Sequence, residues 1–150
     1  MGTNLEEELN IPETIESKVV TVIGESAFEG CELLRRVNLP RDLVTIEEKA
    51  FAGSSAGYVF CTSGASLETI GAEAFKDCAN LIQFDIKAVK TIGKDAFAGC
   101  SALQVFTLRT DADLTKDAFG DANNFKVVTH EECEKLIKFA KDSGHDVQIF

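Results

Sequence analysis

The stretch Ile23-Gly-Glu-Ser-Ala-Phe28 returns four more times along this chain of 150 residues. The further copies are Ile46-Glu-Glu-Lys-Ala-Phe51, Ile70-Gly-Ala-Glu-Ala-Phe75, Ile92-Gly-Lys-Asp-Ala-Phe97 and Leu114-Thr-Lys-Asp-Ala-Phe119. Their Ala-Phe pairs lie 23, 24, 22 and 22 residues apart. A period of about 20 to 50 residues is typical of a solenoid, in which stacked repeats share one continuous core.

The repeat extends on both sides of this stretch. In four copies an apolar residue precedes the aliphatic position by three places. Three copies continue with a Leu and two apolar residues spaced by two, and two of these three also carry a Gly-Cys pair, Gly30-Cys31 and Gly99-Cys100. The preceding residues are Val20, Leu43, Leu67 and Val89, and the final pairs are Val37 and Leu39, Phe84 and Ile86, Phe106 and Leu108. A spacing of two places both side chains on one face of a strand. Each repeat is therefore expected to end in a short strand with one buried face.

This pattern, Leu-x-x-Val-x-Leu with Ile-Gly-x-x-Ala-Phe-x-Gly-Cys on the return, resembles the BspA-like (surface-antigen type) leucine-rich repeat over about residues 9 to 130. The resemblance implies a right-handed leucine-rich-repeat solenoid of about five repeats of 22–24 residues, with a parallel β-sheet on its concave side. It also implies roles in adhesion and protein recognition.

The second repeat departs from the pattern. It carries Ser54 at the Cys position and Gly57 where Leu is expected, and it continues as Tyr58-Val-Phe-Cys-Thr62. We interpret this as one extra residue in the turn, with Tyr58, Phe60 and Thr62 facing inward so that Phe60 aligns with Phe84. The alternative register buries Val59 and Cys61 instead, because a slip of one residue exchanges the two faces of a strand.

We expect a single solenoid domain over residues 1–150, divided into an N-terminal partial repeat or cap (1–19), the repeats (20–128) and a C-terminal cap (129–150). At the C-terminus Cys133, Leu136, Ile137 and Ala140 follow the spacing of an amphipathic helix. Thr129 and Glu132 form a candidate capping box, and Gly144 is a candidate helix stop. Val147 and Ile149 then alternate as a short final strand.

The net charge of −10, from 15 basic and 25 acidic residues, disfavours nucleic acids and anionic membranes as partners. No apolar stretch approaches the length of about 18 residues of a membrane span, and residues 1–8 do not resemble a secretion signal. The sequence leaves the location open between the cytoplasm, if the chain is complete, and the cell surface or secretion, if it is a fragment.

Candidate catalytic and metal sites are few, so we expect a non-enzymatic protein without a cofactor. Cys31, Cys78 and Cys100 share one repeat position and are interpreted as buried free thiols that pack as small apolar groups. His130 and Cys133 are interpreted as a surface and a core residue of the capping helix, because no further ligand pair supports zinc. Glycines after the aliphatic residue (Gly24, Gly71, Gly93) indicate a tight bend or close backbone contact, but Glu47 in the same place argues against an obligatory positive φ.

The candidate binding site is the exposed face of the concave sheet. Strand alternation places on it Arg36, Asn38, Val59, Cys61, Gln83, Asp85, Val105, Thr107 and Val127, bordered by Lys87 and Arg109. We expect this face to bind a protein partner, with a host or matrix protein or a glycan as the narrower possibilities. The alternatives are a merely solvated sheet in a structural spacer, and an intracellular scaffold element without a dedicated ligand. The oligomeric state stays open.

Overall fold

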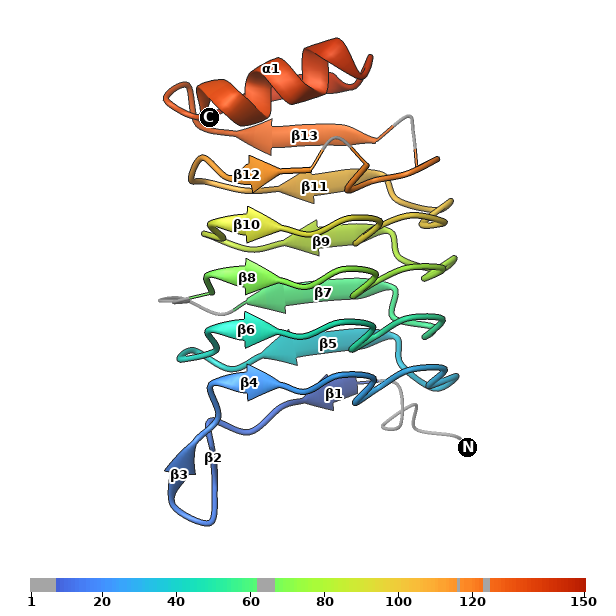
Figure 1. The fold of residues 1–150 in the computed structure, drawn as a ribbon, viewed down its shortest axis with the longest axis vertical. Coiled ribbons are helices and arrows are strands. Elements are labelled where there is room, and N and C mark those ends of the chain that lie inside the picture. Colours follow the sequence, from blue (N-terminus) through green and yellow to red (C-terminus); the bar gives the residue numbers. More distant parts are fainter. Residues whose placement is uncertain (1–7, 62–66, 116, 123–124) are drawn as a thin grey trace, which may run out of the picture.

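The computed structural model describes residues 8–61, 67–115, 117–122 and 125–150. It is a solenoid of about five turns in which each turn contributes one strand to each of two parallel sheets. Figure 1 shows the turns stacked one above another, with β1 at one end and α1 at the other. The expectation of a leucine-rich-repeat solenoid with a C-terminal helix is confirmed.

The longer sheet has seven strands, all in parallel pairing. In spatial order these are β1 (Glu8–Asn10), β5 (Arg36–Leu39), β7 (Tyr58–Cys61), β9 (Gln83–Asp85), β11 (Val105–Thr107), β13 (Lys126–Thr129) and β14 (Asp146–Ile149). We call it the long sheet. It consists of the strands expected from the paired apolar residues, together with the final strand after the helix.

The second sheet was not predicted from the sequence. It has five strands of two residues each, β4 (Val22–Ile23), β6 (Thr45–Ile46), β8 (Thr69–Ile70), β10 (Thr91–Ile92) and β12 (Asp113–Leu114). The aliphatic residue of each repeated stretch belongs to one of these strands, and Ile46, Ile70 and Ile92 are buried. An antiparallel hairpin of β2 (Thr14–Ile15) and β3 (Lys18–Val19) precedes this short sheet at the N-terminal end.

The core between the sheets is a column of stacked phenylalanine rings. Phe28, Phe51, Phe75, Phe97 and Phe119 follow one another with centroid separations of 5.0 to 5.4 Å. Phe84 and Phe106 meet this column edge-on from the long sheet. Each fully buried Phe side chain contributes about 1.5 to 3 kcal/mol in transfer terms, so the column is a major source of stability for the stack.

The turn that carries each Phe is held to the next turn by backbone hydrogen bonds. The Phe51 and Phe75 amides donate to the carbonyl oxygens of Ala74 and Ala96, each over 2.8 Å. The residue two places before each Phe has a positive φ of 54° to 56°, at Ser26, Lys49, Glu73 and Asp95. The glycines Gly24, Gly71 and Gly93 do not have a positive φ, as expected from Glu47 at their place.

The C-terminal cap consists of helix α1 (Glu134–Asp142) and strand β14, which continues the long sheet beyond β13. Leu136 and Ala140 are buried against the last turn, and Cys133 precedes the helix as its N-cap residue. The predicted capping box is wrong, because Thr129 belongs to β13 and its Oγ1 is buried without a hydrogen-bond partner among the described residues. Instead Asp111, from the preceding turn, accepts hydrogen bonds from the amides of Lys135 and Leu136 at 3.2 and 3.1 Å.

Candidate interaction surface

The strand register of the long sheet decides which side chains face solvent. Val37, Val59, Phe84, Phe106 and Val127 lie opposite one another along the sheet and are all fully buried. The sequence-based assignment of Val59 and Val127 to the exposed face is therefore wrong. Cys61 lies opposite the buried Leu39, so it too belongs to the inner row, although it is half-buried.

The error at Val127 arises in the fifth turn, where Val127 follows Phe119 by only eight positions, and the error at Val59 arises from the length of the second turn. Val59 follows Phe51 by eight positions, whereas Val37, Phe84 and Phe106 follow their own Phe residues by nine. The turn is thus one residue shorter than its neighbours, not longer as interpreted from the sequence. Ser55 links this turn to the preceding one. Its Oγ accepts a hydrogen bond from the Leu34 amide at 3.0 Å and donates one to the Leu34 carbonyl oxygen at 3.1 Å. Thr62, expected inward, lies outside the described residues.

The corrected register brings two aromatic rings onto the exposed face of the long sheet. Tyr58 and Phe60 are half-buried, and their rings are nearly parallel with centroids 6.3 Å apart. The Arg36 guanidinium lies over the Phe60 ring, with Cζ 5.4 Å from the centroid. Sequence reasoning missed both aromatic residues, and the signal that could have found them is the shortened spacing after Phe51. We call Arg36, Tyr58 and Phe60 the aromatic patch.

Polar residues surround the aromatic patch in the neighbouring strands. Gln83 lies opposite Tyr58, and Asp85 lies opposite Phe60. On the other side Asn38 donates hydrogen bonds to Glu8 Oε1 at 2.8 Å and to Asn10 Oδ1 at 2.7 Å. The structure thus places Arg36, Asn38, Gln83 and Asp85 on one side of the sheet, as expected from the sequence.

Farther along the face, Val105 is half-buried next to Gln83. Thr107 lies opposite Asp85 but is only 6% exposed, which leaves it little surface for a partner. Lys87 and Arg109 are exposed where the strands end, and the Arg109 guanidinium lies 5.1 Å from the ring centroid of Phe150. Val128, not Val127, is the outward residue of β13, as its pairing with Thr107 shows.

A groove adjoins the aromatic patch at the side where the strands begin. Its volume is about 400 Å³, and its lining crosses several turns of the solenoid, with Leu33, Leu34, Gly57, Tyr58, Ile82 and Ala102 among the lining residues. Leu33 is 67% exposed and adds an apolar side chain to the lining of this groove. The groove and the aromatic patch share Tyr58, so one partner could contact both.

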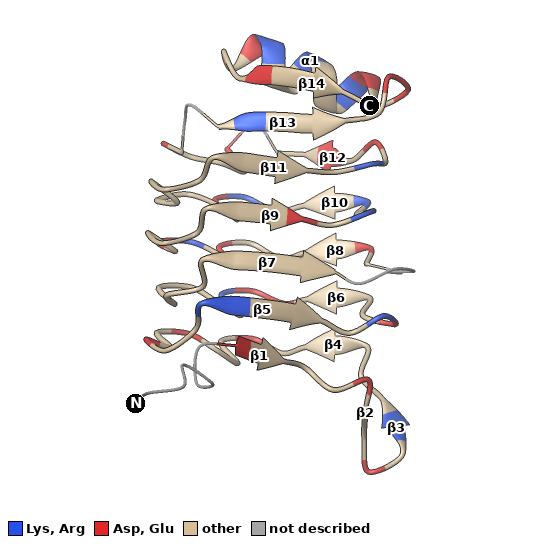
Figure 2. Cartoon of the chain, turned by 180° about the vertical axis from the view of Figure 1, so that it is seen from behind, with Lys and Arg blue, Asp and Glu red and all other residues tan. Residues whose placement is uncertain are grey.

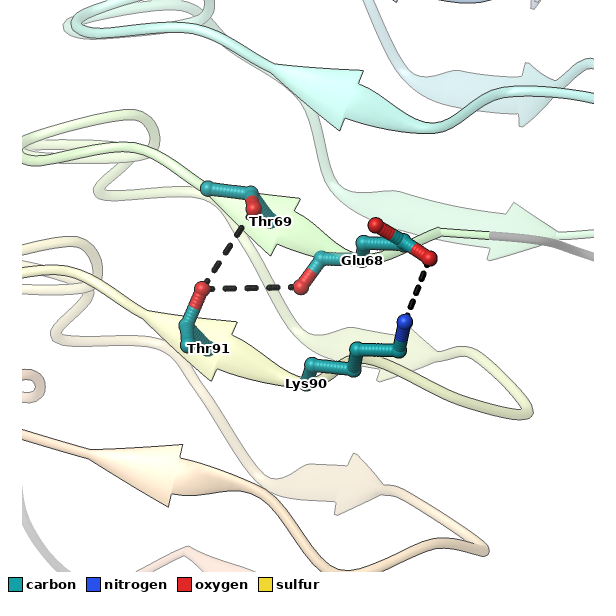
Figure 3. Close-up of polar contacts among 4 residues, drawn as sticks. All are labelled: Glu68, Thr69, Lys90 and Thr91. Carbon is teal, nitrogen blue, oxygen red and sulfur yellow. Dashed lines mark hydrogen bonds and ion pairs between the residues drawn. The ribbon is translucent and has the colours of Figure 1, made fainter.

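On the opposite face, that of the short sheet, side chains of neighbouring turns contact one another beside a hollow of about 440 Å³. Figure 3 shows an ion pair between Lys90 and Glu68, and Thr91 Oγ1 lies 3.4 Å from Thr69 Oγ1. The Thr69 and Thr91 side chains stack because their strands pair in register. This face carries no aromatic side chain on its described strands.

The cysteines behave as packing groups. Cys78 and Cys100 are buried, and their thiols donate to the carbonyl oxygens of Phe51 and Phe75, each over 3.1 Å. Burial raises the pKa of the Cys78 thiol to about 11 and raises that of Cys100 further, which disfavours the reactive thiolate. Cys31 is only half-buried, so the expectation of a buried thiol holds for two of the three equivalent positions.

The described part of the chain contains no cluster of three or more side chains suited to a metal ion. His130 is exposed, and Cys133 is buried at the start of α1, as interpreted from the sequence. The only helix among the described residues has nine residues, too few to cross a bilayer.

Comparison with known proteins identifies the repeat. The sequence pattern of the BspA type leucine-rich repeat region matches residues 2–126 in six copies. The chain belongs to this family. No curated protein matches it.

Several solved leucine-rich repeat structures resemble this BspA-type repeat protein. The pneumococcal vaccine antigen PcpA matches at 19% identity with a TM-score of 0.67, over 96% of this chain and 41% of PcpA. A leucine-rich cell surface protein from Faecalibacterium prausnitzii A2-165 matches at 19% identity and a TM-score of 0.60, over 85% of this chain and 45% of that one. A leucine-rich repeat protein from Bacteroides ovatus ATCC 8483 matches at 25% identity and a TM-score of 0.59, over 96% and 42%. The chain thus spans less than half the length of these three proteins.

Proposed function

We propose that this BspA-type repeat protein is a non-catalytic recognition module that binds a protein partner on the exposed face of the long sheet. The observation that carries the proposal is the aromatic patch, where Tyr58 and Phe60 lie side by side beneath Arg36. Tyr and Arg are enriched among the residues that dominate binding energy in protein interfaces. A solvated sheet face needs no such cluster.

Two further features support the same face. The groove next to Tyr58 can receive an apolar side chain of the partner, and its lining combines Leu33 with backbone around Gly57. Extended surfaces of stacked repeats commonly bind proteins. Two of the similar structures are described as a vaccine antigen and as a cell surface protein, which is consistent with adhesion as the setting of this recognition.

The proposal is tested by capture experiments with three forms of the protein. The wild type, the variant Tyr58→Ala/Phe60→Ala and the control variant Thr69→Ala/Thr91→Ala are immobilised, and captured proteins are identified after washing. Recognition through the long sheet predicts that a protein captured by the wild type and by the control is lost with the Tyr58→Ala/Phe60→Ala variant. Circular dichroism and thermal unfolding show whether each variant keeps the fold.

An unchanged set of captured proteins across all three forms would contradict binding at the aromatic patch. Absence of any captured protein, together with end-to-end oligomers in light scattering, would instead favour a structural spacer. The two outcomes are distinct, because the spacer depends on the ends of the stack and the recognition module on its side.

A further inference from the structure

The charge of the long-sheet face differs from that of the rest of the protein. The outward residues of its strands, with Lys87 and Arg109 at the border, include four cations and three carboxylates: Arg36, Lys87, Arg109 and Lys126 against Glu8, Asp85 and Asp146. This face therefore carries one net positive charge, although the whole chain carries −10, and the remainder of the sequence carries −11. Figure 2 shows this face, with basic segments at the start of β5 and of β13 and an acidic segment at the end of β9.

Among the described residues, the four cations of this face form no ion pair, although Glu8 lies opposite Arg36 and Asp146 opposite Lys126 in the neighbouring strands. The ion pairs within the described residues involve Lys49, Lys76, Lys90, Lys135 and Lys138, none of which lies on the long-sheet face. Arg36 and Arg109 instead contact the rings of Phe60 and Phe150, and Lys126 donates to Gln148 Oε1 at 3.5 Å. Cations that form no such ion pair can contact the carboxylates of a partner.

We infer that the partner presents an acidic segment of a protein, in which carboxylates flank an apolar side chain. This inference rests on the proposed function and specifies the chemistry of its partner. The apolar side chain would contact Tyr58 and Phe60 or enter the adjoining groove, while the carboxylates reach Arg36 and Lys87. The negative charge elsewhere on the protein repels the same segment and so directs it to this face.

The spacing of the cations favours a protein segment over a sulfated glycan. Arg36 and Lys126 lie on β5 and β13, with three strands between them. Four spacings of roughly 4.8 Å per strand place β5 and β13 about 19 Å apart. Tyr58, Phe60 and Val105 lie between them, together with the polar Gln83 and Asp85 of β9. Protein interfaces commonly combine such apolar contacts with polar and charged ones.

Substitution of Asp85 distinguishes an acidic partner from a basic one, because the two predict opposite changes in binding affinity. It is half-buried beside Phe60, and its carboxylate forms no hydrogen bond or ion pair among the described residues. Its carboxylate opposes an acidic partner, so its neutralisation should strengthen binding. If the partner were basic, Asp85 would be its natural counter-charge, and the same substitution would weaken binding.

The probe is an acetylated and amidated peptide, Glu-Glu-Gly-Leu-Phe-Gly-Glu-Glu, titrated into the full chain and followed by amide NMR at low and at physiological salt. Its matched controls replace all Glu residues by Gln or by Lys. We expect the acidic peptide to shift amides of β5, β7 and β9, with binding that weakens as salt rises. The variant Arg36→Gln/Lys87→Gln should weaken binding about 5- to 10-fold, as expected for two partly exposed charge contacts.

The control variant Lys90→Gln/Lys138→Gln changes the net charge by the same amount on other faces and should weaken binding less than about 2-fold. Asp85→Asn should strengthen it about 2- to 5-fold. Weaker binding by Asp85→Asn, binding of the Gln or Lys peptide as tight as that of the acidic one, or no binding of any peptide would overturn the acidic partner. Tighter binding of a heparin tetrasaccharide than of the acidic peptide would overturn it in favour of a glycan.

Failure of this inference and failure of the proposed function give different results. If the Lys or Gln peptide shifts the amides around Tyr58 and Phe60, the recognition face stands and only the acidic partner is wrong. If the acidic peptide shifts only amides of the short sheet, both are wrong.

Discussion

Gly71 and Gly24 occupy the same place in two repeats, but their surroundings differ. A Cβ atom on Gly71 would lie 2.7 Å from the Glu48 amide nitrogen, whereas a Cβ on Gly24 would meet nothing nearer than Glu47 Oε2 at 3.8 Å. The difference arises because Gly71 packs against the turn before it, while Gly24 lies at the first turn of the stack. Glycine thus allows close backbone contact at position 71, whereas it has no such role at position 24.

We therefore expect Gly71→Ala to destabilise the protein by about 1 to 3 kcal/mol, because the backbone contact at Glu48 must open. Gly24→Ala should be neutral or stabilise by up to about 1 kcal/mol, because alanine restricts the unfolded chain. Urea unfolding of the two variants gives both values. Equal midpoints for the two variants would contradict the close approach at Gly71.

At the scale of the element, helix α1 depends on a residue from a different turn. Asp111 accepts hydrogen bonds from two amides in the first turn of the helix, and it replaces the Thr129 cap expected from the sequence. Its carboxylate also lies at the positive end of the helix dipole. The cap is therefore attached to the last repeat by a specific polar contact as well as by Leu136 and Ala140.

The variant Asp111→Ala should lower the free energy of unfolding by about 1 kcal/mol, the usual effect of removing an N-terminal cap. Thr129→Val should be neutral or stabilising, because the Thr129 hydroxyl is buried without a partner in the described structure. Thermal or chemical unfolding monitored by circular dichroism measures both. A loss of stability in Thr129→Val with none in Asp111→Ala would instead support the capping box expected from the sequence.

His145, in the same cap, is expected to make the stability of the protein depend on pH. Its ring stacks on Phe125 with centroids 3.9 Å apart and lies near Phe119 and Phe139, and this burial lowers the pKa of the imidazole in the folded protein. The unfolded chain, with an ordinary His pKa of about 6.5, then binds more protons than the folded one at mildly acidic pH. The contribution of His145 to the free energy of unfolding is fully present above about pH 6.5. It decreases as the pH falls towards the lower pKa of the folded state.

We expect unfolding midpoints of the wild type to decrease between pH 7.5 and pH 5.5 by more than those of His145→Phe, with a slope from His145 of at most about 1.4 kcal/mol per pH unit. His130→Gln is the matched control, because it removes an exposed histidine near the same cap. The same pH dependence in His145→Phe as in the wild type would show that His145 does not cause it.

The whole molecule is a linear stack whose inner turns have neighbours on both sides. Strands β8 and β10 are paired on both edges, whereas β1 and β4 each have one partner in their sheets. The C-terminal end differs from the N-terminal end because α1 and β14 cover it. Repeat proteins of this kind gain stability from contacts between adjacent turns, so the ends are the least stable parts.

Native-state hydrogen exchange should accordingly be slowest for amides in β8 and β10 and fastest in β1 and β4, with β11 and β13 closer to the inner turns. The C-terminal end should thus be protected more than the N-terminal one. Uniform protection along the stack would mean that the turns open only together, and faster exchange in β13 than in β4 would mean that the cap contributes little.

The sequence alone determined the period, the core and the kind of cap. The Phe column, the buried Ile row and helix α1 follow from apolar spacings that recur within each repeat, and such spacings depend on local geometry that every turn shares. Five of the outward residues, Arg36, Asn38, Gln83, Asp85 and Val105, were placed correctly for the same reason, because their turns have the common length.

Only the tertiary structure decided the register of β7, the partner of the helix N-terminus and the identity of the aromatic patch. Each of these features depends on how the residues of one turn align with those of the next turn, about 22 positions away. Where a turn changes length, the sequence does not give this alignment. The loss of one residue between Phe51 and Val59 exchanged the faces of a whole strand. Tyr58 and Phe60 are exposed for that reason alone, since the neighbouring strands fix the position of β7 through their backbone hydrogen bonds.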